Sequence, residues 1–290
     1  MSGGGSARRW EAGRLALRLA LFLSMTGIAL LVLMVVAFAL PVFSAGESGG
    51  PFSWVWAPAQ GKFGILPMIA GSLILGTSAL ALGWPLAAAL CCWLIAPPPS
   101  GRFSRLSRAL VGELVRLMTA VPTVVYGFTA VFLLSPFIRS WLGGTGMSGL
   151  TAAVMLGVLI LPTVVLVLQA GLGARLESVA LSGAALGMDR MEVLWHVVLP
   201  RARDTLLASA ILGFGRAVGD TMLPLMLAGN APQLPASPLA ALRTLTAHMA
   251  LVTSNEAGSA AYDSLFMAGL ILLTVNAVVS LCLRRLGGRS

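Results

Sequence analysis

The chain has 290 residues, of which 58% are hydrophobic and 10% are charged, and its mean hydropathy is +0.92. Because soluble domains carry about a quarter charged residues, this composition excludes an ordinary soluble protein and predicts an all-α membrane protein. The net charge of +9 does not indicate a nucleic-acid partner, since the basic residues form no patch with interleaved aromatic residues. They flank apolar segments instead, as expected beside an anionic membrane surface.

The apolar stretches predict about six transmembrane helices in one polytopic bundle, since each span needs about 20 apolar residues. They lie near Leu19–Phe43, Leu66–Ile95, Ala109–Leu134, Leu150–Leu172, Leu206–Ala228 and Leu265–Leu283. We therefore expect a cytoplasmic N-terminal segment (1–18), a transmembrane domain (19–285) and a short cytoplasmic tail (286–290).

The first span follows four arginines and could be read as a signal peptide. However, the uncharged stretch Leu19–Ala45 is about 27 residues long, whereas the apolar core of a signal peptide has about 7–15. The sequence therefore predicts an uncleaved membrane anchor.

The basic residues predict that both termini are cytoplasmic, because cytoplasmic loops are enriched in Lys and Arg. In this orientation 15 of the 19 basic residues lie on the cytoplasmic side. Only Lys62, Arg139 and Arg243 then lie in outer loops, and Arg216 lies within the membrane.

The third span is interrupted early by Glu113 and Arg116, which can pair at i, i+3, and Arg116 can extend its charge toward the interface. Further along, Thr123 and Tyr126 place hydroxyl groups at membrane depth beside Pro122, which frees a backbone carbonyl in a helix. These hydroxyls could line a polar route or could satisfy one another, and the sequence leaves both possibilities open.

The segment between the fourth and fifth spans, 173–204, is the most polar part of the chain. Within it, Met188–Val198 reads as an amphipathic helix ended by Pro200, with these apolar positions at helical spacing: Met191, Leu194, Trp195 and Val198. Such a helix outside the bilayer suits docking of a partner protein, with Trp195 or Leu194 inserted into the partner. A helix lying on the lipid surface is the alternative.

The fifth span carries Arg216 and Asp220, about ten residues or more into an otherwise apolar stretch. Charges at bilayer depth cost a few kcal/mol and are rarely incidental. Their i, i+4 spacing predicts that they pair on one helical face. A guanidinium binds oxyanions through parallel hydrogen bonds, so Arg216 indicates an anionic substrate, and a purely structural ion pair is the alternative.

Three glycines of the same span, Gly213, Gly215 and Gly219, would allow close helix packing, and we expect Gly215 and Gly219 to face a partner subunit. In the outer loop that follows, Leu239–Leu251 reads as an amphipathic stretch on the surface.

No catalytic residue, metal site or cofactor bound by this chain is predicted. The three cysteines, Cys91, Cys92 and Cys282, lie in apolar runs without metal-ligand spacing, and His196 and His248 are isolated. The single lysine, Lys62, is not part of a phosphate-cradling loop, so the chain is not itself a P-loop ATPase.

Four segments resemble the permeases of ABC importers. Gly187, Val197, Leu199 and Pro200 stand at the positions of the EAA-loop pattern Gly-x9-Ile-x-Leu-Pro, although Leu181 replaces its glutamate. Three more segments are similar to phosphate-specific permeases of the PstC type, with Asp220 in place of a glutamate: Leu66–Leu73, Val121–Phe128 and Gly215–Met222.

The resemblance implies a type I ABC importer permease fold and a substrate, inorganic phosphate. It also implies an EAA-like loop, 173–204, that couples to an ATPase through these residues: Gly187, Met191, Leu194, Trp195, Val197, Leu199 and Pro200. The implied partners in the bacterial inner membrane are a second permease of the PstA type, a cytoplasmic ATPase dimer of the PstB type that binds ATP and Mg, and an external phosphate-binding protein of the PstS type.

Three other functions are weighed against this one. A permease for sulfate or molybdate is disfavoured by the segment Gly215–Asp220. An ion-coupled secondary transporter usually shows paired, interrupted repeats, which the sequence lacks. A signalling or scaffold component leaves the charges of Arg216 and Asp220 unexplained.

Overall fold

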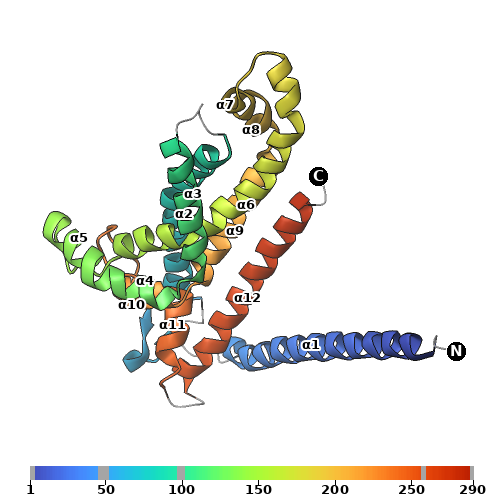
Figure 1. Cartoon of the computed structure of the whole chain (residues 1–290). Helices are drawn as coiled ribbons and strands as arrows, with labels where there is room; N and C mark the ends of the chain where they lie inside the picture. Colours follow the sequence, from blue (N-terminus) through green and yellow to red (C-terminus); the bar gives the residue numbers. More distant parts are fainter. Residues whose placement is uncertain (1–3, 45–51, 97–101, 256–258, 288–290) are drawn as a thin grey trace.

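The computed structural model describes residues 4–44, 52–96, 102–255 and 259–287, which fold almost entirely into helices (Figure 1). Beside them a short antiparallel pair, β1 (Trp56–Ala57) and β2 (Lys62–Phe63), encloses a 3-10 turn. The helices are α1 (Gly4–Ser44), α2 (Leu66–Ile95), α3 (Arg102–Ala120), α4 (Thr123–Thr129), α5 (Ser135–Leu142), α6 (Gly149–Ala185), α7 (Arg190–Val193), α8 (Leu199–Arg201), α9 (Arg203–Gly219), α10 (Met222–Leu227), α11 (Leu245–Val252) and α12 (Ala260–Gly287). The all-α prediction is confirmed.

Five helical stretches within the described residues are long and apolar enough to cross a membrane. They are Gly13–Leu40, Leu66–Ile95, Thr123–Leu142, Gly149–Ala185 and Ala261–Arg285. Four of them overlap the first, second, fourth and sixth predicted spans, and the fourth continues to Ala185, into the segment that was predicted as a cytoplasmic loop. The third and fifth predicted spans are each divided in two.

The third predicted span is wrong as a continuous helix. It is broken at Val121 and Pro122, between α3 and α4, and Pro122 has extended backbone angles (φ −60°, ψ 139°). Proline disfavours helical geometry in the residue before it and cannot donate a backbone hydrogen bond. The candidate span therefore begins at Thr123 and runs through α4, a π-helical turn (Ala130–Leu134) and α5.

The fifth predicted span is also wrong as one helix. It is divided at Asp220, whose backbone is extended (φ −73°, ψ 135°), so that α9 stops at Gly219 and α10 restarts at Met222. The break has local hydrogen-bond partners: the Asp220 carboxylate accepts from the Leu223 amide, and its carbonyl accepts from the Thr246 hydroxyl. These bonds replace part of the helical ladder that the break interrupts.

The core is built where α2 crosses α6. Gly83 and Gly157 face each other at the crossing, and a Cβ atom on Gly83 would lie 2.5 Å from the Gly157 carbonyl oxygen. Side chains of the first half of α6, such as Leu156 and Ile160, form one core cluster with α2, α4 and α10. Side chains of its second half, such as Leu168 and Leu172, form a second cluster with α2 and the α7–α8 region.

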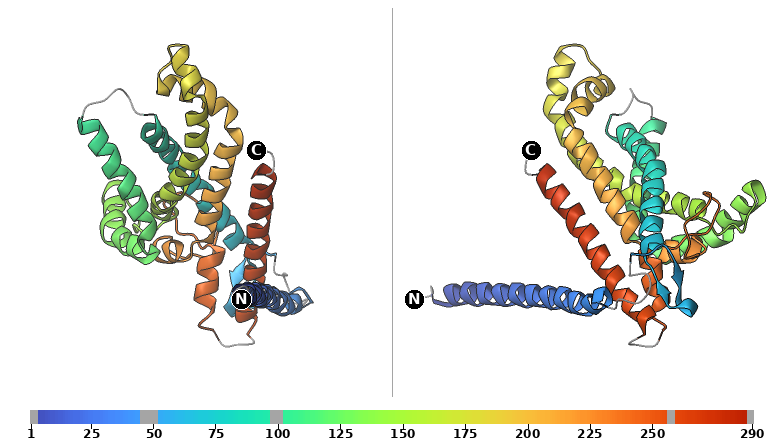
Figure 2. Two further views of the ribbon diagram at one scale, coloured as in Figure 1. Left: turned by 45° about the vertical axis from the view of Figure 1, so that its right-hand side comes forward. Right: turned by 180° about the vertical axis from the view of Figure 1, so that it is seen from behind.

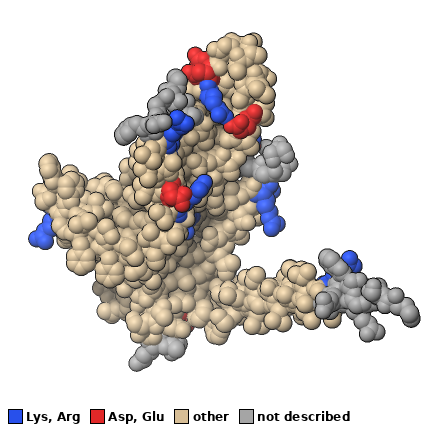
Figure 3. Space-filling view, in the orientation of Figure 1, with Lys and Arg blue, Asp and Glu red and all other residues tan. Residues whose placement is uncertain are grey.

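Helix α1 projects away from this bundle (Figures 1 and 2). None of the most apolar part of its candidate span is buried in the chain. Its contact with the rest of the molecule is at α12, where Phe38 stacks on Phe266 with ring centroids 4.9 Å apart. Charged side chains gather over the α7–α8 end of the bundle and are sparse elsewhere on the face shown in Figure 3.

The sequence had predicted that the stretch Leu239–Leu251 lies on the surface, and this prediction is wrong. Leu245–Val252 forms α11, and several of its side chains are buried. His248 is fully buried, with Nε2 3.0 Å from the Ser264 hydroxyl and its ring edge-on to Trp56. Burial, together with the nearby Arg243 charge, lowers the pKa of His248 to about 4, so the ring is neutral at pH 7.

Candidate functional site

Arg216 is an exposed residue of α9 and lines an open cavity of about 450 Å³ between α6, α9 and α12. The cavity is lined by Thr163, Leu212, Gly215, Arg216, Gly219, Asp220, Asn276 and Val279. Arg216 forms no hydrogen bond or ion pair with any residue that the structure describes. A guanidinium that is free of protein partners keeps all five N–H donors available for an anion.

The sequence had predicted an ion pair between Arg216 and Asp220, and this prediction is wrong. The two residues interact electrostatically, but they are not within ion-pair distance, and the carboxylate instead accepts a 2.9 Å hydrogen bond from the Leu223 amide. The cause is the break at Asp220, because an i, i+4 pair requires a continuous helix. Both side chains nevertheless line the same cavity.

Tyr126 and Thr123 are not among the residues that line this cavity. Tyr126 is buried in the first core cluster, and its hydroxyl donates a 2.9 Å hydrogen bond to the Met118 carbonyl. The guanidinium of Arg216 is close enough to act electrostatically on the Tyr126 hydroxyl. Thr123 is half-buried in the first turn of α4. The sequence left open whether the Tyr126 hydroxyl lines a polar route or is satisfied within the protein. In this structure its hydrogen bond is made within the protein, to the Met118 carbonyl.

Two polar residues of the cavity, Thr163 on α6 and Asn276 on α12, were missed by the sequence analysis. Asn276 was visible as a polar residue within an apolar span, and such residues commonly face a bundle interior or a cavity. Thr163 had no comparable signal, because threonine hydroxyls in helices can bond their own backbone.

The three glycines of α9 do not share one role. Gly213 packs against α2 and α6, where a Cβ atom would lie 3.0 Å from Val164 and 3.4 Å from Leu80. Gly215 faces Val279 of α12. Only Gly219 opens onto unoccupied space, so the prediction that Gly215 and Gly219 form one face toward a partner is wrong for Gly215.

The end of α6 and the short helices after it form a second feature, here called the coupling element (residues 173–204). Gly187 has φ +79°, a left-handed conformation that glycine adopts without a Cβ clash. Its amide donates to the Ala184 carbonyl, and the Met188 amide donates to the Gly183 carbonyl, which is the hydrogen-bonding of a helix C-terminus closed by glycine. Gly187 therefore closes the end of α6.

The predicted apolar stripe of the coupling element is divided between two faces. Leu194 and Val198 are fully or almost fully buried in the second core cluster, and Met191, Val197 and Leu199 pack against it. Trp195 is 58% exposed. Residues Leu194–Val198 form a π-helical turn, and its wider repeat turns Trp195 outward. Leu194 is therefore not available to a partner.

The prediction that Pro200 ends the amphipathic helix is wrong. It stands in the first positions of α8, which continues to Arg201, where a missing amide hydrogen is tolerated. The backbone changes direction at Ala202 instead, immediately before α9.

A charged clamp holds the coupling element to the bundle. Arg175 of α6 donates to the Arg201 carbonyl and to the Asp204 carboxylate, both at 2.6 Å. Burial alone would raise the pKa of Asp204, but the hydrogen bond from Arg175 and the Thr205 amide outweigh it and lower the pKa. Arg190 forms an ion pair with Glu177. The Arg175 contacts attach the end of α6 to the Arg201 carbonyl and to Asp204 of α9.

No group of three or more His, Cys, Asp or Glu side chains among the described residues could hold a metal ion. The cavity brings together an exposed arginine, a carboxylate and two uncharged polar side chains, Thr163 and Asn276.

The family model described as "Binding-protein-dependent transport system inner membrane component" matches residues 93–289. The chain belongs to this family of inner-membrane transport permeases. The matched region covers α3 to α12 and contains both the cavity and the coupling element.

Named relatives of this permease cover most of both chains. A probable ABC transporter permease protein, YqgH, of Bacillus subtilis is 30% identical over 238 residues, which are 81% of this chain and 75% of that protein. The phosphate transport system permease protein PstC of Pasteurella multocida is 28% identical over 264 residues, 82% of this chain and 81% of that protein. PstC of Xylella fastidiosa is 27% identical over 251 residues, 79% and 75%. The resemblance to PstC-type permeases is confirmed, and the chain is a multi-pass protein of the inner membrane.

Proposed function

We propose that this permease forms part of the pathway of an ATP-driven inorganic phosphate importer. The observation that carries the proposal is Arg216, a guanidinium without a protein partner among the described residues, in an open cavity between α6, α9 and α12. Its N–H donors are free to bind an anion, and the planar guanidinium matches phosphate oxygens through two parallel hydrogen bonds. The names of the PstC relatives support phosphate as the anion.

In this proposal the cavity walls complete the anion site. Asn276 and Thr163 supply uncharged polar groups. Asp220 sets the helix break that opens the cavity and offsets part of the Arg216 charge at a distance. Tyr126 ties α4 to α3 through the Met118 carbonyl and packs in the core cluster that includes α10, and Thr123 stands in the first turn of the same helix beside the pathway.

Transport against a gradient needs a source of energy, and we assign it to a separate cytoplasmic ATPase dimer that binds ATP and Mg. The exposed Trp195 is the docking residue, supported from below by Met191, Leu194, Val197 and Leu199. Gly187 and Pro200 set the ends of the docking element, and Gly219 remains open for a second permease. An external phosphate-binding protein delivers the substrate.

Coupling to a cytoplasmic ATPase requires the α7–α8 end of the bundle to face the cytoplasm, with both termini on that side. Single cysteines at Lys62 and Ser254, in a chain lacking its three natural cysteines, should react with impermeant thiol reagents from outside, whereas a cysteine at Asp189 should not. The opposite pattern would reverse the orientation and remove the docking role of Trp195.

Phosphate uptake by a strain lacking this chain, with and without the chain restored, tests the function directly. Uptake should depend on the chain and should be competed by unlabelled phosphate more strongly than by sulfate or molybdate. Competition in the reverse order would assign the permease to another oxyanion, a candidate that the B. subtilis relative, whose name gives no substrate, leaves open.

A further inference from the structure

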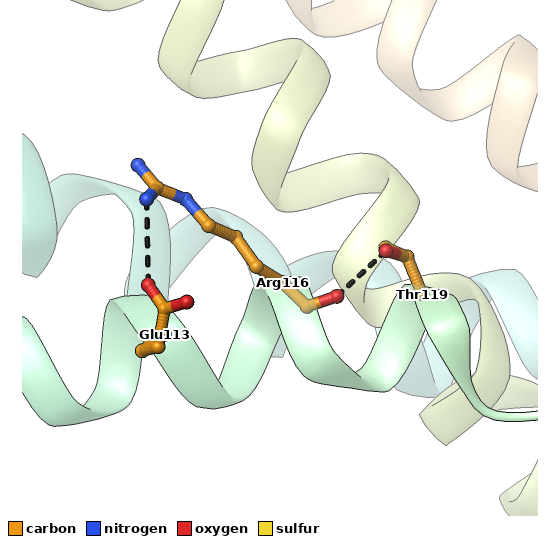
Figure 4. Close-up of polar contacts among 3 residues, drawn as sticks. All are labelled: Glu113, Arg116 and Thr119. Atoms are coloured by element: carbon orange, nitrogen blue, oxygen red, sulfur yellow. Dashed lines mark hydrogen bonds and ion pairs between the residues drawn. The ribbon is translucent and has the colours of Figure 1, made fainter.

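Helix α3 carries an acid–base pair that the proposed site does not use. The Arg116 and Glu113 side chains are 72% and 63% exposed, and one guanidinium nitrogen, Nη1, lies 3.4 Å from one carboxylate oxygen. Figure 4 shows the Arg116 side chain running back along α3 to reach Glu113. In Figure 3 an acidic and a basic side chain lie together over the region of α3, on an otherwise uncharged part of the surface.

The neighbours of α3 place this pair level with the proposed anion site. Val115 is buried in the second core cluster, to which α6 contributes residues from Val164 onward, whereas Met118 packs against the first cluster, to which α6 contributes residues up to Ile160. Arg116 therefore stands where the two clusters meet along α6. Thr163, which lines the Arg216 cavity, occupies the same level of α6. Arg116 is also about 21 Å along the helix from Arg102, at 1.5 Å per residue.

The exposed surface of α3 is divided into an apolar and a polar stripe. Four leucines that are 56–60% exposed recur every three or four residues: Leu106, Leu110, Leu114 and Leu117. On the adjoining face, charged, polar and small residues follow the same helical spacing: Arg105, Ala109, Glu113, Arg116 and Thr119. The leucines suit lipid or apolar protein, whereas the charges of the adjoining stripe suit water or a polar ligand.

The ion pair itself is loosely made. A structural Arg–carboxylate pair is typically bidentate, with distances of about 2.7–2.9 Å, whereas Arg116 uses one nitrogen at 3.4 Å. The other N–H donors of the guanidinium have no hydrogen-bond partner within the described part of the chain. Thr119 bonds the Arg116 carbonyl at 2.6 Å (Figure 4) and leaves the guanidinium free.

We propose that the polar stripe of α3 is a second anion-binding step, in which Arg116 binds the oxyanion and Glu113 holds the guanidinium while no anion is present. The anion displaces one weak contact, and the Glu113 carboxylate beside it then favours release. Arg105 continues the stripe toward the Arg102 end, the cytoplasmic end in the proposed orientation. This inference rests on the proposed function, because it requires that the chain carries an oxyanion.

The test is phosphate uptake by the complete complex in proteoliposomes, with subunit recovery measured for every variant. Arg116→Gln should lower uptake by about tenfold or more, as expected when a charged contact is lost, and Arg139→Gln, an exposed arginine on α5, is the matched control. Arg116→Lys should retain most uptake, since a contact through one nitrogen needs only a point charge. Glu113→Gln should lower both KM and kcat, because release slows.

The double variant, with Arg116→Gln and Glu113→Gln together, distinguishes an anion-binding role of the pair from a purely structural ion pair. An anion step predicts uptake as low as in Arg116→Gln, whereas restored uptake would overturn the proposal, because removing both charges relieves a merely structural pair. Arg116→Cys in a cysteine-free chain gives a direct reading: a reagent that adds an ammonium group should restore uptake, and one that adds a sulfonate should not. Restoration by both or by neither reagent would also overturn it.

Failure of the proposed function is distinguishable. If the unaltered complex carries sulfate or molybdate instead of phosphate, the phosphate assignment fails, and the same variants are then measured with the transported oxyanion. If Arg116→Gln and the control are equally active with that oxyanion, the α3 step fails while the importer function stands.

Discussion

Replacing Asp220 tests whether its carboxylate acts as a helix cap or as the counter-ion of Arg216. In the structure the carboxylate accepts the Leu223 amide hydrogen at 2.9 Å and lies beyond ion-pair distance of Arg216. Asp220→Asn keeps an acceptor oxygen for that amide, whereas Asp220→Ala removes it. The two variants therefore separate hydrogen bonding from charge.

The expected magnitudes differ. Loss of a capping acceptor costs about 1 kcal/mol, so Asp220→Ala should lower the melting midpoint of the purified complex by about 3 °C. Asp220→Asn should melt close to the unaltered protein. Its phosphate uptake should change by less than about threefold, because charges outside ion-pair contact in a hydrated site contribute under about 1 kcal/mol.

Melting of the purified complex and uptake kinetics in proteoliposomes check both values, with Thr246→Val as a control that removes the other hydrogen bond at the break. If Asp220→Asn abolished uptake as fully as loss of Arg216 while melting normally, the carboxylate charge would be required for transport. The capping argument would then be wrong.

Three further outcomes are expected. Arg216→Gln should reduce uptake by about tenfold or more without loss of assembly, and Arg216→Lys should not restore it, because an ammonium lacks the guanidinium fork; uptake by either variant at the normal rate would refute the anion contact. Trp195→Ala should reduce co-purification of the ATPase while the membrane level of the permease stays normal, and intact ATPase binding by this variant would rule out docking through Trp195. Leu194→Ala should instead destabilise the permease by about 2–5 kcal/mol. Because the pKa of buried His248 is lowered from 6.5 to about 4, its contribution to stability is complete above pH 6.5 and declines by up to about 3 kcal/mol as the pH falls toward 4. The melting midpoint of His248→Gln should therefore depend less on pH than that of the unaltered protein, and an equal dependence would contradict this.

Much of the fold follows from short-range properties that the sequence contains. The spans of α2, α6 and α12 were predicted because an apolar run of sufficient length has one stable form in lipid, a helix that satisfies its own backbone. Gly187 stands at its motif position, and its left-handed backbone is a conformation that glycine adopts without a Cβ clash. The family resemblance likewise depended on local motifs at fitting separations.

The breaks and the exposure of individual side chains were decided by contacts distant in sequence. The end of α9 at Asp220 depends on Thr246, which lies 26 residues away, and no helical periodicity contains that information. The role of the Tyr126 hydroxyl could not be predicted, because its hydrogen-bond partner, the Met118 carbonyl, is brought within reach only by the break between α3 and α4. Trp195 and Leu194 are neighbours of similar hydrophobicity, and only packing of the π-helical turn against α6 determines which is buried. Helical spacing predicts which side chains share a face of a continuous helix, but tertiary packing decides whether the helix is continuous and which of its faces is covered.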